Sequence, residues 1–208
     1  MSVLATADLL ISGAERDWRD PLLRLEQLFD GNIWEPLSAA DNTEVQTAAG
    51  CINGARVIAY CTNATRMGGA VSSAGSQRII EAIETAVRYR CPVIGVWHSG
   101  GAKLADGVES MDAVGQMFVA MTRASGRIPQ ISVVVGPAAG AAAYGPALTD
   151  VIVMAPAAYI SLTPMSRLAV FRATRTAPHK NERGMTRCGG DAPARESTRG
   201  HATVDWQN

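Results

Sequence analysis

Two turns rich in small residues follow apolar runs in the middle of the chain, and their composition suits a ligand that touches the backbone. They lie within residues 96–103, which contain Ser99-Gly100-Gly101-Ala102, and within residues 135–144, which contain Gly140-Ala141. Small residues let a ligand approach main-chain atoms, and the start of a helix leaves partly positive N–H groups without partners. One N–H from each turn could donate to a single carbonyl oxygen and stabilise an oxyanion or enolate. Tight packing of strand against helix is the alternative interpretation.

A third glycine cluster, Arg66-Met67-Gly68-Gly69-Ala70, lies earlier in the chain. It does not match the phosphate-binding loop pattern, because no Gly-Lys-Ser/Thr follows, and the chain has no GxGxxG. Arg66 could contact a phosphate group of a ligand or could simply be solvated. The cluster is therefore a candidate binding segment of low specificity.

Side chains that could act as acid, base or nucleophile are few near these turns. His98 borders the first turn without an obvious aspartate partner, so we expect a structural hydrogen-bonding role. Ser99 is not set in GxSxG, and Glu109 is a single carboxylate on the following helix. The pattern favours stabilisation by backbone electrostatics over side-chain catalysis.

The surrounding periodicity predicts an α/β fold in which strands alternate with helices around a mainly parallel sheet. Asn53-Gly54 between two apolar runs predicts a β-hairpin. Apolar residues at steps of three and four predict amphipathic helices, one with Ile79, Ile80, Ile83 and Val87 on one face. The expected helices are residues 22–28, 75–90, 107–126 (with Val108, Met111, Val114, Phe118 and Met121 on one face) and 138–148, and the expected strands are residues 45–52, 55–62, 92–97, 130–135 and 151–154.

Bulk composition argues against several classes of function. Basic and acidic residues both total 19, so no net field attracts nucleic acid or an acidic membrane. The longest strongly apolar run, residues 131–135, is too short to span a bilayer, and the start of the chain lacks the basic region of a signal peptide. The cysteines lack metal-ligand spacing, so we expect no metal, buried free thiols at Cys51, Cys61 and Cys91, and a cytoplasmic protein.

The last 44 residues differ in composition from the rest. Residues 1–164 carry 11 basic and 15 acidic residues, whereas residues 165–208 carry 8 basic and 4 acidic residues. Only four of those 44 residues are Val, Ile, Leu or Phe, too few to offset the entropy cost of ordering the segment. We expect a flexible N-terminus over residues 1–17, one domain over residues 18–163 and a disordered segment over residues 164–208.

Residues 97–155 resemble the carboxyltransferase (β) subunit of biotin-dependent acetyl-/propionyl-CoA carboxylases, especially of the actinobacterial type. The sequences DPLLRLEQLFD (20–30) and TRMGGAVSSAG (65–75) are similar to the same family. The resemblance runs from about residue 18 to residue 163. It implies the N-terminal, crotonase-like half of a carboxyltransferase (ClpP/crotonase superfamily), which transfers CO2 from carboxybiotin to the α-carbon of acetyl- or propionyl-CoA.

The resemblance also assigns roles to the glycine turns. The family holds the thioester enolate with backbone N–H groups, for which the matching positions are Gly100, Gly101 and Ala102; Gly140 and Ala141 match a Gly-Gly pair near the same site. Arg66, Gly68 and Gly69 would contact the CoA moiety. The implied cofactor is biotin on a separate carrier domain, without a metal. The implied partners are the biotin carboxylase/carrier α subunit and other β subunits.

After Thr163 the chain departs from the family pattern. Family members continue with a second crotonase-like domain, whereas residues 164–208 have the composition of an out-of-frame reading of GC-rich coding sequence, and we expect a frameshift or degenerate gene. Two functions follow: a carboxyltransferase component that acts through partners, or an inactive remnant that at most binds CoA esters or intact β subunits. A ClpP-like peptidase is disfavoured because no Ser/His/Asp set is evident.

Overall fold

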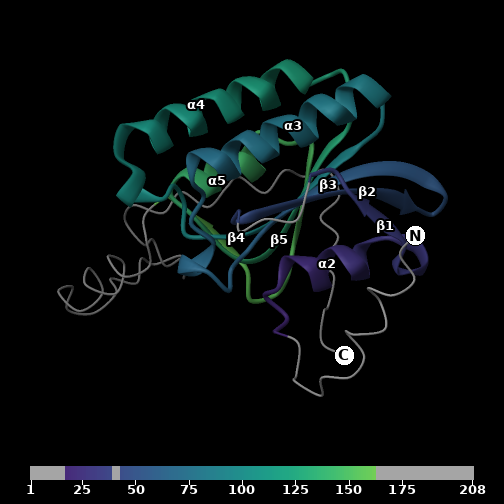
Figure 1. Cartoon of the computed structure of the whole chain (residues 1–208), viewed down its shortest axis with the longest axis horizontal. Helices are drawn as coiled ribbons and strands as arrows, with labels where there is room; N and C mark the ends of the chain where they lie inside the picture. Colours follow the sequence, from purple (N-terminus) through teal and green to yellow (C-terminus); the bar gives the residue numbers. More distant parts are fainter. Residues whose placement is uncertain (1–16, 39–42, 163–208) are drawn as a thin grey trace, which may run out of the picture.

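The computed structural model describes residues 17–38 and 43–162. These residues form a seven-stranded sheet in the order β1-β2-β3-β4-β5-β6, with β7 paired to β5. Helices α3 and α4 lie side by side over one face of the sheet, and α2 lies against the opposite face (Figure 1). The expected α/β class with a mainly parallel sheet is confirmed.

The regular elements are short and closely spaced along the chain. The helices are α2 (Pro21–Leu28), α3 (Ser73–Tyr89), α4 (Gly107–Ala124) and α5 (Ala141–Ala147), with 3-10 turns at Asp30–Asn32, Met67–Gly69 and Leu104–Asp106. The strands are β1 (Trp34–Pro36), β2 (Val45–Ile52), β3 (Ala55–Thr62), β4 (Val93–Ser99), β5 (Gln130–Ala139), β6 (Val151–Met154) and β7 (Tyr159–Ser161).

The first three strands are antiparallel and contain the expected hairpin. Asn53 and Gly54 at its tip both have positive φ, 51° and 75°, which matches the twist of a two-residue hairpin. The carboxylate of Asp30 accepts hydrogen bonds from both tip N–H groups, at 3.0 and 2.8 Å. These bonds lower the pKa of Asp30, because the ionised form is the better acceptor.

The remaining strands run parallel, and here two predicted boundaries are wrong, the end of β5 and the start of α5. Strand β5 continues to Ala139 because its last three residues pair with β7, which the sequence did not predict. Gly140 then has φ 57° and ψ −126°, so helix α5 begins at Ala141 instead of residue 138. The short strand β1 also lay outside the prediction.

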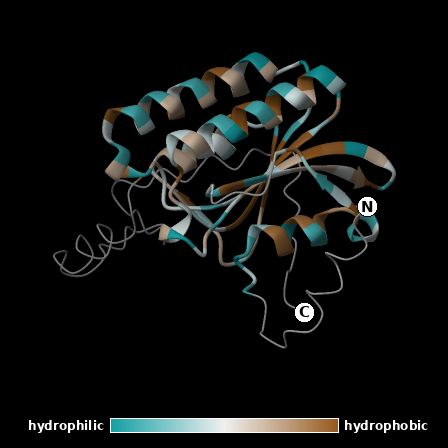
Figure 2. Ribbon diagram, viewed as in Figure 1, coloured by the Kyte–Doolittle hydropathy of each residue, from teal (hydrophilic) through white to brown (hydrophobic). Residues whose placement is uncertain are grey.

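Burial on the helices follows the predicted pattern in α3 but not in α4. Ile79, Ile80 and Ile83 of α3 are buried, and its outer face is hydrophilic (Figure 2). In α4, Val108 and Met111 are exposed, and the buried stripe shares only Val114 and Met121 with the predicted face. It runs through Ser110, Val114, Met117, Met121 and Ala124. The predicted apolar face of α4 is therefore only partly correct.

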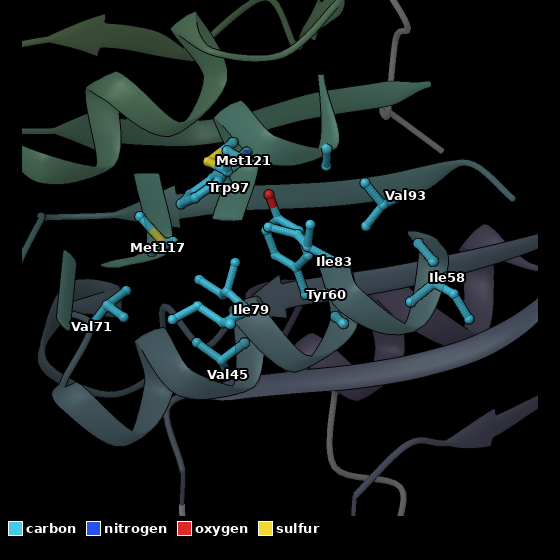
Figure 3. Packing of buried hydrophobic residues seen from close by; sticks show 14 of the residues in the cluster. Val45, Ile58, Tyr60, Val71, Ile79, Ile83, Val93, Trp97, Met117 and Met121 are labelled. Atoms are coloured by element: carbon cyan, nitrogen blue, oxygen red, sulfur yellow. The ribbon is translucent and has the colours of Figure 1, made fainter. Parts of the chain in front are cut away.

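The larger core lies between the sheet and α3 and α4 (Figure 3). Tyr60 and Trp97 point toward each other there, with ring centroids 5.4 Å apart in an edge-to-face arrangement. The Trp97 indole N–H donates to the buried Ser132 Oγ at 3.0 Å. A smaller cluster on the other face packs Leu25 and Phe29 of the α2 region against β3 and β4.

Cys61 and Cys91 are buried free thiols as expected, but Cys51 is exposed. Cys51 lies near the tip of the β2–β3 hairpin, opposite the exposed Arg56, so strand alternation does not bury it. In the part of the chain that the structure describes, no helix has the length and hydropathy needed to cross a membrane. The expectations for residues 1–16, residues 163–208 and Cys188 lie outside the described residues.

Candidate active site

The three glycine clusters, far apart in sequence, meet at the carboxyl ends of β4 and β5. The Gly100 N–H donates to the Gly68 carbonyl oxygen at 2.9 Å. A Cβ placed on Gly101 would lie 2.8 Å from the Ala139 carbonyl oxygen and 3.3 Å from the Ala141 nitrogen, so the two strand-end turns are in van der Waals contact. The structure thus brings together the positions that the sequence proposed for catalysis and for CoA binding.

The first turn is shaped where β4 leaves its regular pairing. The β4–β5 register shifts between Trp97 and Ser99, and such bulges change the direction of a strand. Gly101 has φ 108°, which residues with a side chain rarely adopt. Its N–H donates to the Oγ of the fully buried Ser99 at 3.2 Å. Ser99 therefore stabilises the turn.

A short parallel bridge fastens the first turn to the segment after the third glycine cluster. The Val71 N–H donates to the Gly101 carbonyl, and the Lys103 N–H donates to the Val71 carbonyl, both at 2.8 Å. Lys103 also forms ion pairs with Glu44 (3.8 Å) and Asp106 (3.4 Å). The backbone on both sides of Ala102 is therefore held in place.

The second turn is fixed by β7. Gly140 combines φ 57° with ψ −126°, a combination open mainly to glycine, and its N–H donates to the Ser161 carbonyl at 2.9 Å. The preceding Ala139 pairs with Ser161 in the sheet. Strand β7 thus determines where α5 begins, and with it the position of the Ala141 N–H.

Hydrogen bonding distinguishes between the five backbone positions predicted from sequence. The N–H groups of Gly100, Gly101 and Gly140 are engaged by Gly68, Ser99 and Ser161. Those of Ala102 and Ala141 have no hydrogen-bond acceptor among the described residues. Sequence reasoning did not make this distinction, because Gly68 and Ser161 are distant in sequence and the local Ser99–Gly101 bond depends on the shape of the turn after the β4 bulge.

His98 points away from the turns, toward α2, and its Nδ1 lies 3.1 Å from the Arg24 Nη2. Burial, with the Arg24 charge as a smaller cause, lowers the pKa of His98 to about 4. The imidazole is therefore neutral at neutral pH, and Nδ1 accepts the hydrogen bond because a guanidinium only donates. The expected structural role of His98 is confirmed.

The other polar candidates contribute little side-chain chemistry. Glu109 is exposed, and the hydrogen bond that it accepts from the Ser73 hydroxyl is long, at 3.5 Å. Arg66 is also exposed, and a Cβ on Gly68 would meet open space, so a ligand could approach this segment from solvent. Among the described residues, no group of three or more His, Cys, Asp or Glu side chains could hold a metal ion.

A groove of about 570 Å³ lies between α3 and α4, away from the turns. It is lined by residues such as Ile80, Val87 and Arg123, and by none of the candidate site residues. The chemistry therefore has to be assigned from the turns, where amides without acceptors and close backbone contacts occur together, and not from the groove.

Comparison with known proteins finds beta subunits of acyl-CoA carboxylases among the curated relatives. The propionyl-CoA carboxylase beta chain of Rhodococcus erythropolis is 56% identical over 152 residues, which are 73% of this chain and 32% of that protein. The biotin-dependent acetyl-/propionyl-coenzyme A carboxylase beta6 subunit of Mycobacterium tuberculosis (strain ATCC 25618 / H37Rv) is 56% identical over 151 residues, with the same coverage of both chains. The chain spans about a third of the length of these curated relatives.

Similar solved structures include a transcarboxylase and a further acyl-CoA carboxylase beta subunit. The transcarboxylase 12S structure with methylmalonyl-coenzyme A and methylmalonic acid bound has a TM-score of 0.70 at 29% identity, covering 84% of this chain and 39% of that one. The beta subunit of geranyl-CoA carboxylase from P. aeruginosa has a TM-score of 0.63 at 26% identity, covering 69% and 30%. The fold is that of the crotonase-like carboxyltransferases, as expected.

The carboxyl transferase domain family matches residues 28–184. This range runs past residue 163, where we placed the end of the resemblance, so the proposed domain boundary stays a prediction. The match covers well over half of the chain and includes all three glycine clusters. The chain belongs to the carboxyl transferase domain family.

Proposed function

We propose that this chain supplies the acyl-CoA half of a carboxyltransferase site, in which the Ala102 and Ala141 N–H groups hold the thioester oxygen. The observation that carries the proposal is that two strand-end turns touch, and that each presents one N–H without an acceptor among the described residues. Gly100, Gly101 and Gly140 then shape the site through their backbone. The proposal narrows the five predicted positions to two donors.

The chemistry follows from charge development on the thioester. Removing a proton from the α-carbon turns the thioester into an enolate and places negative charge on its oxygen. Two preorganised N–H donors stabilise that charge more than they stabilise the neutral carbonyl, so they lower the barrier. Losing one such donor typically costs about 100- to 1,000-fold in kcat. The enolate carbon would then form a bond to the carboxyl carbon while the bond between that carbon and its donor breaks; the donor would keep the electron pair and take up the proton that the α-carbon lost.

The two turns offer no separate set of N–H donors for biotin, the cofactor of the family. Three of their five candidate amides are used within the chain, and the thioester oxygen would take the other two. We therefore assign no residue of this chain to biotin and derive no step through it. Arg66, Gly68 and Gly69 remain the proposed contacts for the CoA moiety; the exposure of Arg66 and Gly68 supports this assignment.

The names of the relatives support a finer proposal. The substrate would be acetyl- or propionyl-CoA, and the partners would be a biotin carboxylase/carrier subunit and further β subunits. We add to the proposal, from the resemblance alone, that malonyl-CoA formed from acetyl-CoA would feed fatty acid synthesis. Transcarboxylase 12S assembles as a hexamer, which is compatible with a β-subunit oligomer. We retain a cytoplasmic location as part of the same proposal.

Binding of propionyl-CoA tests the donor assignment directly. Ala141→Pro removes the N–H at the first position of α5, where proline fits a helix. Ala141→Gly keeps the N–H and serves as the matched control. Calorimetric titration should show about 2- to 10-fold weaker binding for Ala141→Pro, as expected for one neutral hydrogen bond, and little change for Ala141→Gly. Equal affinities in the two variants would remove Ala141 from the site.

Turnover separates a working component from a binding remnant. The purified chain is incubated with free biotin and malonyl-CoA, and decarboxylation is followed. We expect none from the chain alone. Decarboxylation that is lost in Ala141→Pro would overturn the remnant alternative, whereas binding without turnover is expected both of a component that needs its partners and of a remnant.

A further inference from the structure

A polar cluster of the buried Arg24, the half-buried His98 and the exposed Trp18 lies on the side of the sheet opposite α3 and α4. The Arg24 Nη2 donates to the His98 Nδ1 at 3.1 Å, and its Nε donates to the Trp18 carbonyl at 2.9 Å. The Trp18 ring contacts both partners, with its centroid 5.5 Å from that of His98 and 5.2 Å from the Arg24 guanidinium carbon. Helix α2 is thereby joined to the C-terminal end of strand β4.

His98 is also held through its backbone, at the point where β4 changes direction. The Thr62 hydroxyl accepts from the His98 N–H at 2.9 Å and lies 3.1 Å from the His98 carbonyl, to which it can donate. A Cβ on Gly136 would overlap the imidazole, so the ring lies flat over β5. Three residues further on is Gly101, and then Ala102. Only Ser99 and Gly100 separate His98 from Gly101, so a shift of the His98 backbone would act directly on the first turn.

Stability alone is a poor explanation for Arg24. Its side chain is 9% exposed, its Nη1 has no partner among the described residues, and burial lowers its pKa. A buried guanidinium that is only partly paired costs desolvation energy, and an apolar side chain of similar size often serves a core better. What the guanidinium provides and an apolar side chain cannot is a pair of directed donors, one to His98 and one to the Trp18 carbonyl.

We propose that Arg24 is a positioning residue that fixes His98, and through it the orientation of the Ala102 amide at the candidate active site. The inference rests on the proposed function for its effect on acyl-CoA binding, but the effect on the turn itself does not depend on that function. The contact also fixes the imidazole tautomer: Nδ1 accepts, so the proton of the neutral ring is on Nε2.

The test uses the full chain labelled with ¹⁵N. Arg24→Met keeps most of the side-chain volume and removes the donor, and Leu25→Ala, at the fully buried neighbouring position of α2, is the control. In Arg24→Met we expect the amide signals of Gly100, Gly101 and Ala102 to shift and the His98 ring to lose its single tautomer. The dissociation constant for propionyl-CoA should rise about 3- to 10-fold, as for one lost or misaligned hydrogen bond.

The control separates positioning from general stability. Leu25→Ala should lower the melting temperature through a cavity, yet leave the three amide signals and the affinity unchanged at a temperature where both variants are folded. Unchanged amides in Arg24→Met, or equal shifts in Leu25→Ala, would overturn the inference. If the parent chain fails to bind propionyl-CoA, the proposed function is wrong. The amide shifts in Arg24→Met still show whether Arg24 positions the turn. Should Arg24→Met not fold, a proton on Nδ1 of His98 in the parent chain would refute the contact, and one on Nε2 would support it.

Discussion

Adding one methyl group to Gly101 tests the geometry of the two turns more directly than any change of charge. A Cβ at this position would lie 2.8 Å from the Ala139 carbonyl oxygen, closer than real Cβ atoms approach an oxygen. The φ of 108° is also unfavourable for alanine. Gly100 is the matched control, because its φ is not in the positive range and its Cβ would lie 3.6 Å from the Gly68 carbonyl, an ordinary contact.

The expected magnitude has two parts. A residue with a side chain held in a rarely adopted backbone conformation costs about 1–3 kcal/mol, and overpacking against rigid backbone adds about 1–3 kcal/mol. Gly101→Ala should therefore lower the free energy of unfolding by about 2–6 kcal/mol. For a domain of this size each kcal/mol corresponds to about 2–4 °C, so the melting temperature should fall by roughly 4–24 °C. Gly100→Ala should stay within about 1 kcal/mol of the parent chain.

Circular dichroism at 222 nm during heating measures the melting temperatures of both variants under the same conditions. Because Gly101 also positions the Ala102 amide, its variant should bind propionyl-CoA more weakly than Gly100→Ala when both are folded. If the two variants melt within 2 °C of each other, the turns do not touch as described. The reasoning that brings the two amides to one oxygen would then fail.

Three further predictions concern other parts of the molecule. His98 has a pKa of about 4 in the folded chain against 6.5 in the unfolded chain, so protonation favours the unfolded chain. The free energy of unfolding should therefore fall by at most about 2 kcal/mol between pH 7 and pH 5. Urea titrations should show a smaller fall for His98→Gln. Ser132→Ala leaves the buried Trp97 N–H without an acceptor and should cost about 1–3 kcal/mol, measured by urea unfolding; an unchanged midpoint would contradict this. Peptide mapping after iodoacetamide treatment should find Cys51 labelled in the native chain and Cys61 labelled only after unfolding; native labelling of Cys61 would disprove its burial.

Local patterns in the sequence predicted most of the fold. Asn53-Gly54 has the positive φ values that a two-residue hairpin needs, and Ile79, Ile80 and Ile83 form the buried face of α3. Both results depend on interactions between residues close in sequence, which a pattern can reveal. The exposed Val108 of α4 shows the limit, because the angle at which a helix packs on the sheet decides which of its apolar residues are covered.

The candidate site, like the fold, was determined partly by local sequence and partly by the tertiary structure. The sequence by itself determined where small residues allow close approach of the backbone, and it placed those residues after apolar strands. Only the tertiary structure decided which amides are used within the chain, because the acceptors Gly68 and Ser161 are distant in sequence and the β4 bulge shapes the turn in which Ser99 accepts from Gly101. A hydrogen bond between residues far apart in sequence has no local signature, and so the two amides left without acceptors among the described residues, on Ala102 and Ala141, emerged only when the chain was folded.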